Sequence, residues 1–239
     1  MAQTRGTCTD RFSGVRETLE ESLTAHDVGA SVAVYLDGEP LVDLWGGYAD
    51  AARTTPWQRD SILNTWSTTK TMTALCALIL ADRGDLDLTA PVARYWPEFA
   101  AAGKQGVEVR HLLSHTAGLP TWDEPMTVAD LYDWPEATAG GVRLLSPEGC
   151  ERALAEQYRG LDSILGVPMR YGNGYGLHNG WLPNPRACFW GGWGGSMVVV
   201  DLDARMTVSY VMNQMLDPGG TGDGRALGIV VAAYDGLSG

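Results

Sequence analysis

The stretch that begins at Ser67 constrains the fold of this chain more than any other feature of the sequence. Apolar residues recur at three- and four-residue steps over 68–83, and Gly84 follows them, which predicts a helix over these residues. Ser67 stands at the first turn of this helix, three residues before Lys70. Residues three apart share one helical face, so we expect the Ser67 hydroxyl and the Lys70 amine to lie together.

This pair has the chemistry of an activated nucleophile. A serine needs a nearby base, and an ammonium withdrawn from water loses its proton more easily. The helix N-terminus also offers N–H groups that can stabilise a developing oxyanion. The alternative is that Ser67 caps the helix while Lys70 is solvated. The spacing alone favours this alternative, because short motifs often match by chance.

Strands are predicted at both ends of the chain, with helices between and outside them. The predicted strands cover 30–36, 40–47, 186–189, 196–202 and 206–212, with a short strand or loop over 167–177. The predicted helices cover 10–26, 68–83, 91–96, 109–114, 126–136, 147–158 and 225–237. Because both ends supply strands, we expect one α/β domain over 1–239. Its antiparallel sheet would have the terminal helices on one face and the Ser67 helix on the other.

Composition excludes several classes of partner. The formal charge of −12 and a pI near 4.6 argue against nucleic acid and against an anionic membrane surface. The N-terminus has no apolar run and no stretch reaches membrane-spanning length, which predicts a cytoplasmic protein. The cysteines and histidines are scattered without ligand-like spacing, so we predict no metal and no cofactor.

Four motifs follow one another in a specific order along the chain. They are WSTTKTMTAL at 66–75, DLDL at 85–88, YWP at 95–97 and HLLSHTAGLP at 111–120. This series resembles the serine β-lactamase and penicillin-binding-protein superfamily, and most of all its β-lactamase-like (family VIII) carboxylesterases. The resemblance implies an α/β sandwich and an acyl-enzyme on Ser67, with Lys70 as general base or electrostatic activator. It also implies short-chain or small aromatic esters as substrates, with β-lactams as slow alternatives.

A glycine-rich segment over 189–196 supplies the second site motif. Trp190-Gly191-Gly192 occupies the place where relatives carry Lys-Thr-Gly, His-x-Gly or Trp-x-Gly on the strand that faces the nucleophile. By this match the Trp193 N–H joins that of Ser67 in the oxyanion hole, and Trp190 and Trp193 line the substrate pocket with Gly191 and Gly192. Glycine allows such a close backbone approach. The alternative is a glycine-rich strand turn with packed tryptophans.

The tyrosine motif of the family is missing. Relatives carry Tyr-x-Asn or a similar triplet in a helical subdomain between the serine helix and the final strands. We interpret its absence as a large internal deletion, natural or engineered, with a junction near 137–141. Tyr171-Gly172-Asn173 matches Tyr-x-Asn literally, but in a strand-like stretch, so Tyr171 is either a catalytic substitute or an aromatic wall of the substrate pocket.

Two functions therefore remain open. The first is a serine hydrolase acting on a small-molecule ester, and the second is a catalytically silent scaffold that binds ligands or itself. The missing tyrosine favours the scaffold, whereas Ser67, Lys70 and the glycine-rich strand favour the hydrolase. Apolar surface left near Trp122, Trp134 and the Trp190 segment predicts a homodimer that buries it.

Overall fold

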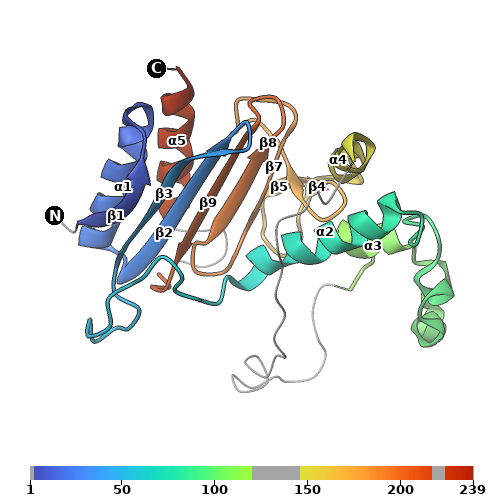
Figure 1. Ribbon diagram of the computed structural model, residues 1–239. Helices are drawn as coiled ribbons and strands as arrows, with labels where there is room; N and C mark the ends of the chain where they lie inside the picture. Colours follow the sequence, from blue (N-terminus) through green and yellow to red (C-terminus); the bar gives the residue numbers. More distant parts are fainter. Residues whose placement is uncertain (1–2, 120–145, 217–223, 239) are drawn as a thin grey trace. The chain divides into compact units, whose positions relative to one another are not determined.

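A computed structural model describes residues 3–119, 146–216 and 224–238 of the chain. It forms two compact units, one made of Met1–Thr73 with Tyr175–Gly239 and the other of Ala74–Gly174 (Figure 1). The boundary falls inside helix α2 (Thr69–Asp82), which confirms most of the helix predicted over 68–83. The helix predicted over 126–136, the junction near 137–141, Trp122 and Trp134 lie outside the described residues. The single domain over 1–239 stays a prediction.

The first unit is built on an antiparallel sheet. Its strands have the order β1-β3-β2-β9-β8-β7-β6, and neighbouring strands run in opposite directions. Their bounds are Thr4–Cys8 (β1), Gly29–Leu36 (β2), Glu39–Gly47 (β3), Gly176–Leu177 (β6), Ala187–Gly191 (β7), Met197–Asp201 (β8) and Met206–Met212 (β9). This confirms the predicted fold class, an antiparallel sheet with strands from both ends of the chain.

Alternating side chains explain why these segments form half-buried strands. Along β9 every second residue is buried, from Met206 through Val208 and Tyr210 to Met212. Period-two alternation of this kind is what a sheet with one face on the core requires. Strand β1 was not predicted from the sequence, because its residues are mostly polar and exposed. It forms only through pairing with β3.

Helices α1 (Ser13–Ala25) and α5 (Arg225–Ser238) cover one face of this sheet, as predicted (Figure 1). A 3-10 turn, η1 (Asp10–Phe12), leads into α1. The two helices contact each other, and the Cβ of Ala232 lies 3.8 Å from where a Cβ on Gly14 would stand. The shared core includes Phe12, Val15, Leu19, Val32, Leu44, Val199, Val208, Tyr210, Ile229 and Ala233.

A buried charge cluster fastens the start of α5 to the rest of the first unit. The Asp27 carboxylate is 1% exposed and forms an ion pair with Arg225, which is 7% exposed. Tyr210 Oη and Ser22 Oγ donate to Asp27 Oδ2 at 2.6 and 2.7 Å. Burial, and then the Asp27 charge, raise the pKa of Tyr210 above its ordinary value. Arg225 Nη2 also donates to the carbonyl of Gly194 at 2.7 Å.

The second unit contains the rest of α2 and several short elements. They are the 3-10 helices η3 (Val92–Arg94) and η4 (Pro97–Gly106), the α-helices α3 (Val109–Leu113) and α4 (Pro147–Leu154), and the antiparallel strands β4 (Tyr158–Leu161) and β5 (Pro168–Tyr171). Ser146 caps α4, because its side chain accepts from the Gly149 N–H.

The helix predicted over 147–158 is wrong at its C-terminal end. It stops at Leu154, and Ala155 leaves the helical region with ψ 111°. The Gln157 N–H then donates to the carbonyl of Tyr171 at 2.8 Å, and Tyr158 begins β4. Pairing with β5 therefore replaces the last helical turn. The segment 167–177, predicted as a short strand or loop, contains β5 and β6.

No helix in the described part of the chain combines the length and the apolarity needed to cross a bilayer. Among the same residues, no three His, Cys, Asp or Glu side chains come together in a way that would hold a metal ion. The four cysteines are free thiols, of which Cys188 is buried and Cys76 is exposed.

Candidate active site

Ser67 lies in a short 3-10 turn, η2 (Trp66–Thr68), that leads directly into α2. The residue before it, Trp66, has a φ of +50°, which is the left-handed region that side chains rarely adopt. The Trp66 N–H donates to Asn64 Oδ1 at 2.8 Å and so supports this conformation. A strained residue of this kind costs about 1–3 kcal/mol and is common at functional sites. The strain here directly precedes the predicted nucleophile.

Lys70 and Ser67 are in contact as their spacing predicts. Lys70 Nζ donates to Ser67 Oγ at 2.9 Å, within normal hydrogen-bond range. Desolvation by the surrounding chain lowers the pKa of the Lys70 amine, although part of its side chain reaches solvent. A lowered pKa increases the fraction of neutral amine near neutral pH. The pair therefore has the geometry in which the amine can accept the Ser67 proton.

The glycine-rich turn between β7 and β8 is bonded to the same segment. Ser196 Oγ donates to the carbonyl of Thr65 at 2.9 Å and lies 2.9 Å from Thr68 Oγ1. Within the turn, the Gly192 N–H donates to the Ser196 carbonyl at 2.8 Å, and the Gly195 N–H donates to the Gly192 carbonyl at 3.1 Å. The residues on either side of Ser67 are thus held against this turn.

Gly192 permits this close approach, and its replacement gives a matched test. A Cβ on Gly192 would lie 2.2 Å from the Thr65 carbonyl oxygen and 2.4 Å from Ser196 Oγ. A Cβ on Gly191 would lie no closer than 3.6 Å to any neighbour. We expect Gly192→Ala to lower the free energy of unfolding by about 1–3 kcal/mol through overpacking, and Gly191→Ala to change it little. Urea unfolding of both variants measures this, and equal losses would contradict the proposed contact.

The predicted pocket residues of the glycine-rich segment lie in one place with the serine. Trp190 and Gly191 end β7, and Gly192 and Trp193 begin the turn that contacts the Ser67 segment. Trp193 is 68% exposed, and its ring centroid lies 6.4 Å from that of Trp66. Trp66 is not among the predicted site residues, although an aromatic residue directly before the serine was a visible signal. The oxyanion roles of the Ser67 and Trp193 N–H groups stay predictions.

Tyr171 belongs to the second unit and is 4% exposed. Its hydroxyl donates to Asp162 Oδ2 at 2.6 Å, and its ring lies against those of His115 and Tyr158. Burial, and then the hydrogen bond to Asp162, raise the pKa of Tyr171 above its ordinary value. A buried tyrosine that donates to a carboxylate is a weak proton acceptor. Its place in the substrate pocket stays a prediction.

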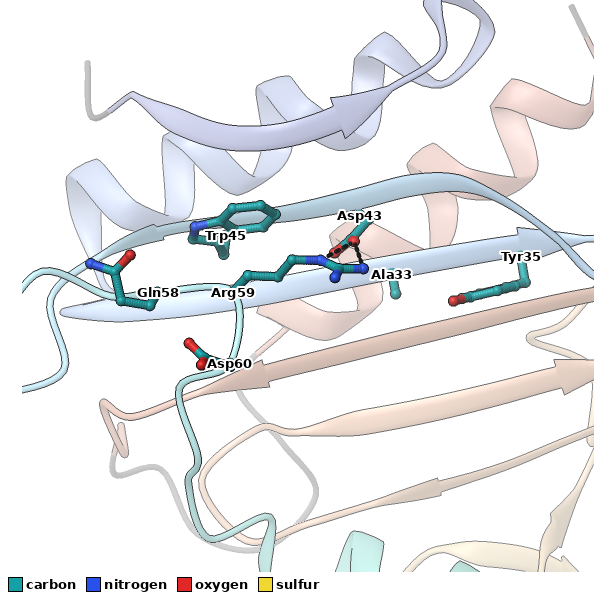
Figure 2. Close-up of a pocket in the computed structure, with 7 residues that line it drawn as sticks. All are labelled: Ala33, Tyr35, Asp43, Trp45, Gln58, Arg59 and Asp60. Carbon is teal, nitrogen blue, oxygen red and sulfur yellow. Dashed lines mark hydrogen bonds and ion pairs between the residues drawn. The ribbon is translucent and has the colours of Figure 1, made fainter. Parts of the chain in front are cut away.

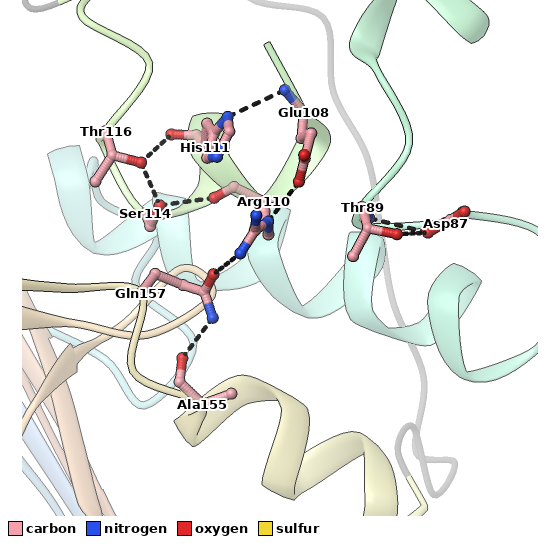
Figure 3. Close-up of polar contacts among 9 residues, drawn as sticks. All are labelled: Asp87, Thr89, Glu108, Arg110, His111, Ser114, Thr116, Ala155 and Gln157. Carbon is pink, nitrogen blue, oxygen red and sulfur yellow. Dashed lines mark hydrogen bonds and ion pairs between the residues drawn. The ribbon is translucent and has the colours of Figure 1, made fainter. Parts of the chain in front are cut away.

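Ser114 and His115 do not form a nucleophile and base, in agreement with their adjacent positions. Ser114 is completely buried, and its Oγ donates to the Arg110 carbonyl at 2.7 Å while lying 2.9 Å from Thr116 Oγ1 (Figure 3). His111 Nδ1 accepts from the Glu108 N–H at 3.1 Å and caps α3. This network stabilises the second unit and leaves the Ser114 hydroxyl engaged with the backbone.

A hollow of about 500 Å³ lies over β2 and β3 in the first unit (Figure 2). Its lining residues are Ala33, Tyr35, Asp43, Trp45, Gln58, Arg59 and Asp60. The Arg59 guanidinium pairs with Asp43 at 2.8 Å inside it. None of the predicted catalytic residues lines this hollow, so it is separate from the Ser67 chemistry.

An antiparallel sheet covered by the two terminal helices, with a Ser-x-x-Lys pair at a helix N-terminus, defines the serine β-lactamase-like class of proteins. The chain belongs to the beta-lactamase family, whose model matches residues 15–155. This confirms the predicted superfamily. The crystal structure of a family VIII carboxylesterase is similar, with a TM-score of 0.89 and 29% identity over 98% of this chain and 100% of that one. A penicillin-binding protein homologue from Caulobacter crescentus has the same fold, with a TM-score of 0.87 and 24% identity over 98% of this chain and 100% of that one.

Curated relatives match shorter parts of the chain. Esterase/beta-lactamase LipL of Mycobacterium tuberculosis is 53% identical over 91 residues, which are 38% of this chain and 21% of LipL. Esterase EstB of Burkholderia gladioli is 40% identical over 99 residues, 40% of this chain and 25% of EstB. A beta-lactamase of Escherichia coli is 32% identical over 66% of this chain and 45% of its own length. The chain thus spans between about a fifth and a half of these relatives.

Proposed function

We propose that this protein is a serine hydrolase that acts on small carboxylic esters through an acyl-enzyme on Ser67. The observation that carries the proposal is the 2.9 Å contact between Lys70 Nζ and Ser67 Oγ at the start of α2. The lowered pKa of the Lys70 amine supports it, because a neutral amine can act as a base. The similar proteins include esterases and a β-lactamase, which favours the same chemistry.

The proposed reaction has two halves. The neutral Lys70 amine takes the Ser67 proton as Oγ forms a bond to the ester carbonyl carbon, and the oxyanion accepts from the N–H groups of Ser67 and Trp193. The bond between carbonyl carbon and alkoxy oxygen then breaks, and the Lys70 ammonium returns its proton to the leaving alcohol. Water next attacks the acyl group and gives the carboxylic acid, with Lys70 again accepting and returning a proton. Ser67 is restored at the end.

Covalent labelling tests this proposal. A fluorophosphonate should add one mass increment per chain, and peptide mapping should locate it on Ser67, because among the residues that the structure describes only this serine hydroxyl contacts a lysine amine. The Ser67→Ala variant and the urea-unfolded chain serve as controls and should remain unlabelled. An adduct on another serine, or no adduct on the folded protein, would contradict the proposal.

A catalytically silent scaffold is the second candidate. The observation that favours it is the state of Tyr171, whose hydroxyl is committed to Asp162 and whose raised pKa keeps it protonated, so that it cannot accept a proton as a base. Such a scaffold would fold with the same sheet and bind a small molecule or a second copy of itself. It predicts a folded chain that does not react with the fluorophosphonate, so the labelling experiment separates the two candidates.

A further inference from the structure

Two indole rings lie beside the nucleophile segment. Trp66 directly precedes Ser67, and Trp193 lies in the glycine-rich turn. Their ring centroids are 6.4 Å apart with the planes tilted by 53°, which is direct aromatic contact. Trp193 nevertheless remains 68% exposed. One large aromatic surface next to the serine is therefore unoccupied by the described parts of the chain.

The backbone explains why these two rings meet. The position of a Cβ on Gly192 lies only 2.2 Å from the Thr65 carbonyl oxygen, so the backbones at 65 and 192 are in contact. The next residue along each segment is a tryptophan. The left-handed φ of Trp66 and the bond from its N–H to Asn64 Oδ1 set the backbone from which the first indole projects. The pair is thus held by the two segments that carry Ser67 and the Trp193 N–H.

An apolar side chain lies next to the turn residue that follows Trp193. Met215 is 42% exposed, and its Cγ lies 2.8 Å from where a Cβ on Gly194 would stand, so it covers the glycine next to Trp193. Because the two indoles already touch, no ligand ring fits between them. A third ring can pack only on the exposed part of Trp193. The π surface of an indole attracts a flat aromatic ring more strongly than a saturated ring of similar size.

We propose that the Trp66–Trp193 pair is an aromatic platform that binds the aryl group of an ester whose carbonyl carbon is attacked by Ser67. This inference rests on the proposed function and adds to it the place where the aryl group of the ester binds. Trp193 contacts the substrate ring. Trp66 is a positioning residue that holds the Trp193 indole in place through the 6.4 Å ring contact.

Matched pairs of esters test the platform. Benzyl acetate and cyclohexylmethyl acetate differ in the alcohol part, and methyl phenylacetate and methyl cyclohexylacetate differ in the acyl part. Each pair compares a flat ring with a saturated one at similar leaving-group chemistry. In the pair of esters whose ring position reaches Trp193, we expect kcat/KM to be about 3- to 10-fold higher for the aryl ester than for the saturated ester. This range corresponds to the usual strength of an aromatic contact.

Variants assign this preference to the two tryptophans. Trp193→Leu should bring the ratio of kcat/KM for the aryl ester to kcat/KM for the saturated ester to about 1. Trp66→Phe should retain most of this aryl preference, and Trp66→Leu should reduce it. Trp96→Leu is the matched control, because Trp96 is 57% exposed and lies in the second unit. A preference that survives Trp193→Leu, or that Trp96→Leu removes, would overturn the platform.

Failure of the platform and failure of the hydrolase are distinguishable. Wild-type protein that is labelled at Ser67 but shows no aryl preference in either pair overturns the platform alone. If no labelling occurs, the hydrolase proposal fails. The binding of two alcohols to the Ser67→Ala variant then tests the platform by itself. An NMR titration with benzyl alcohol and cyclohexylmethanol should show tighter binding of benzyl alcohol, lost in Ser67→Ala/Trp193→Leu. Equal affinity of the Ser67→Ala variant for the two alcohols would overturn the platform.

Discussion

Lys70→Arg is expected to lower kcat/KM on 4-nitrophenyl acetate by about 10²- to 10⁴-fold, the usual contribution of a general base. Arginine keeps the positive charge but does not lose its proton at accessible pH, and its planar guanidinium does not match the 2.9 Å contact of the Lys70 amine with Ser67 Oγ. Lys70→Ala should lose a similar amount. Steady-state rates of the three proteins, corrected for the buffer reaction, measure this.

The pH dependence sharpens the same test. Because desolvation lowers the pKa of the Lys70 amine, the neutral form becomes more abundant as pH rises through a pKa below the ordinary lysine value. The wild-type kcat/KM should therefore rise with pH over that range, and the residual rate of Lys70→Arg should not show this rise. Lys104→Arg changes the other lysine of the chain and is the control. A nearly active Lys70→Arg protein would mean that Lys70 acts only through its charge.

Arg225→Met should lower the free energy of unfolding by about 3–5 kcal/mol, because it leaves the Asp27 carboxylate buried without its cation. Methionine fills much of the space but donates no hydrogen bond. The variant also removes the donor to the Gly194 carbonyl in the turn that carries Trp193. Urea unfolding measures the loss, and a parallel loss of fluorophosphonate labelling under folding conditions is expected.

Two controls separate the charge effect from a packing effect. Arg205→Met removes an exposed ion pair with Asp37 and should change stability little, since exposed pairs contribute about 0–1 kcal/mol. The double variant Asp27→Asn/Arg225→Met should be more stable than Arg225→Met, because no buried charge is left without a partner. If the double variant is as unstable as the sum of its single changes, the loss comes from packing instead.

Local sequence features determined the elements that bear the chemistry. The Ser67–Lys70 contact follows from helical spacing alone, and helix α2 forms where the apolar period predicts it. The hairpin β2–β3 also follows from local sequence, because Asp37 and Gly38 both adopt the positive φ that a two-residue turn requires. The family resemblance was likewise readable, since its motifs are short and occur in order along the chain.

Tertiary contacts decided what local patterns do not encode. Strand β1 is polar and exists only because β3 offers an edge, and the end of α4 is set by pairing of the next residues with β5. The buried pair of Asp27 and Arg225 joins residues 198 positions apart, and the indoles of Trp66 and Trp193 meet only because Gly192 touches Thr65. Such contacts depend on which surfaces the fold brings together, and burial then gives them their energetic weight. The sequence determined the reactive groups of this protein, whereas the packing of distant segments decided their surroundings.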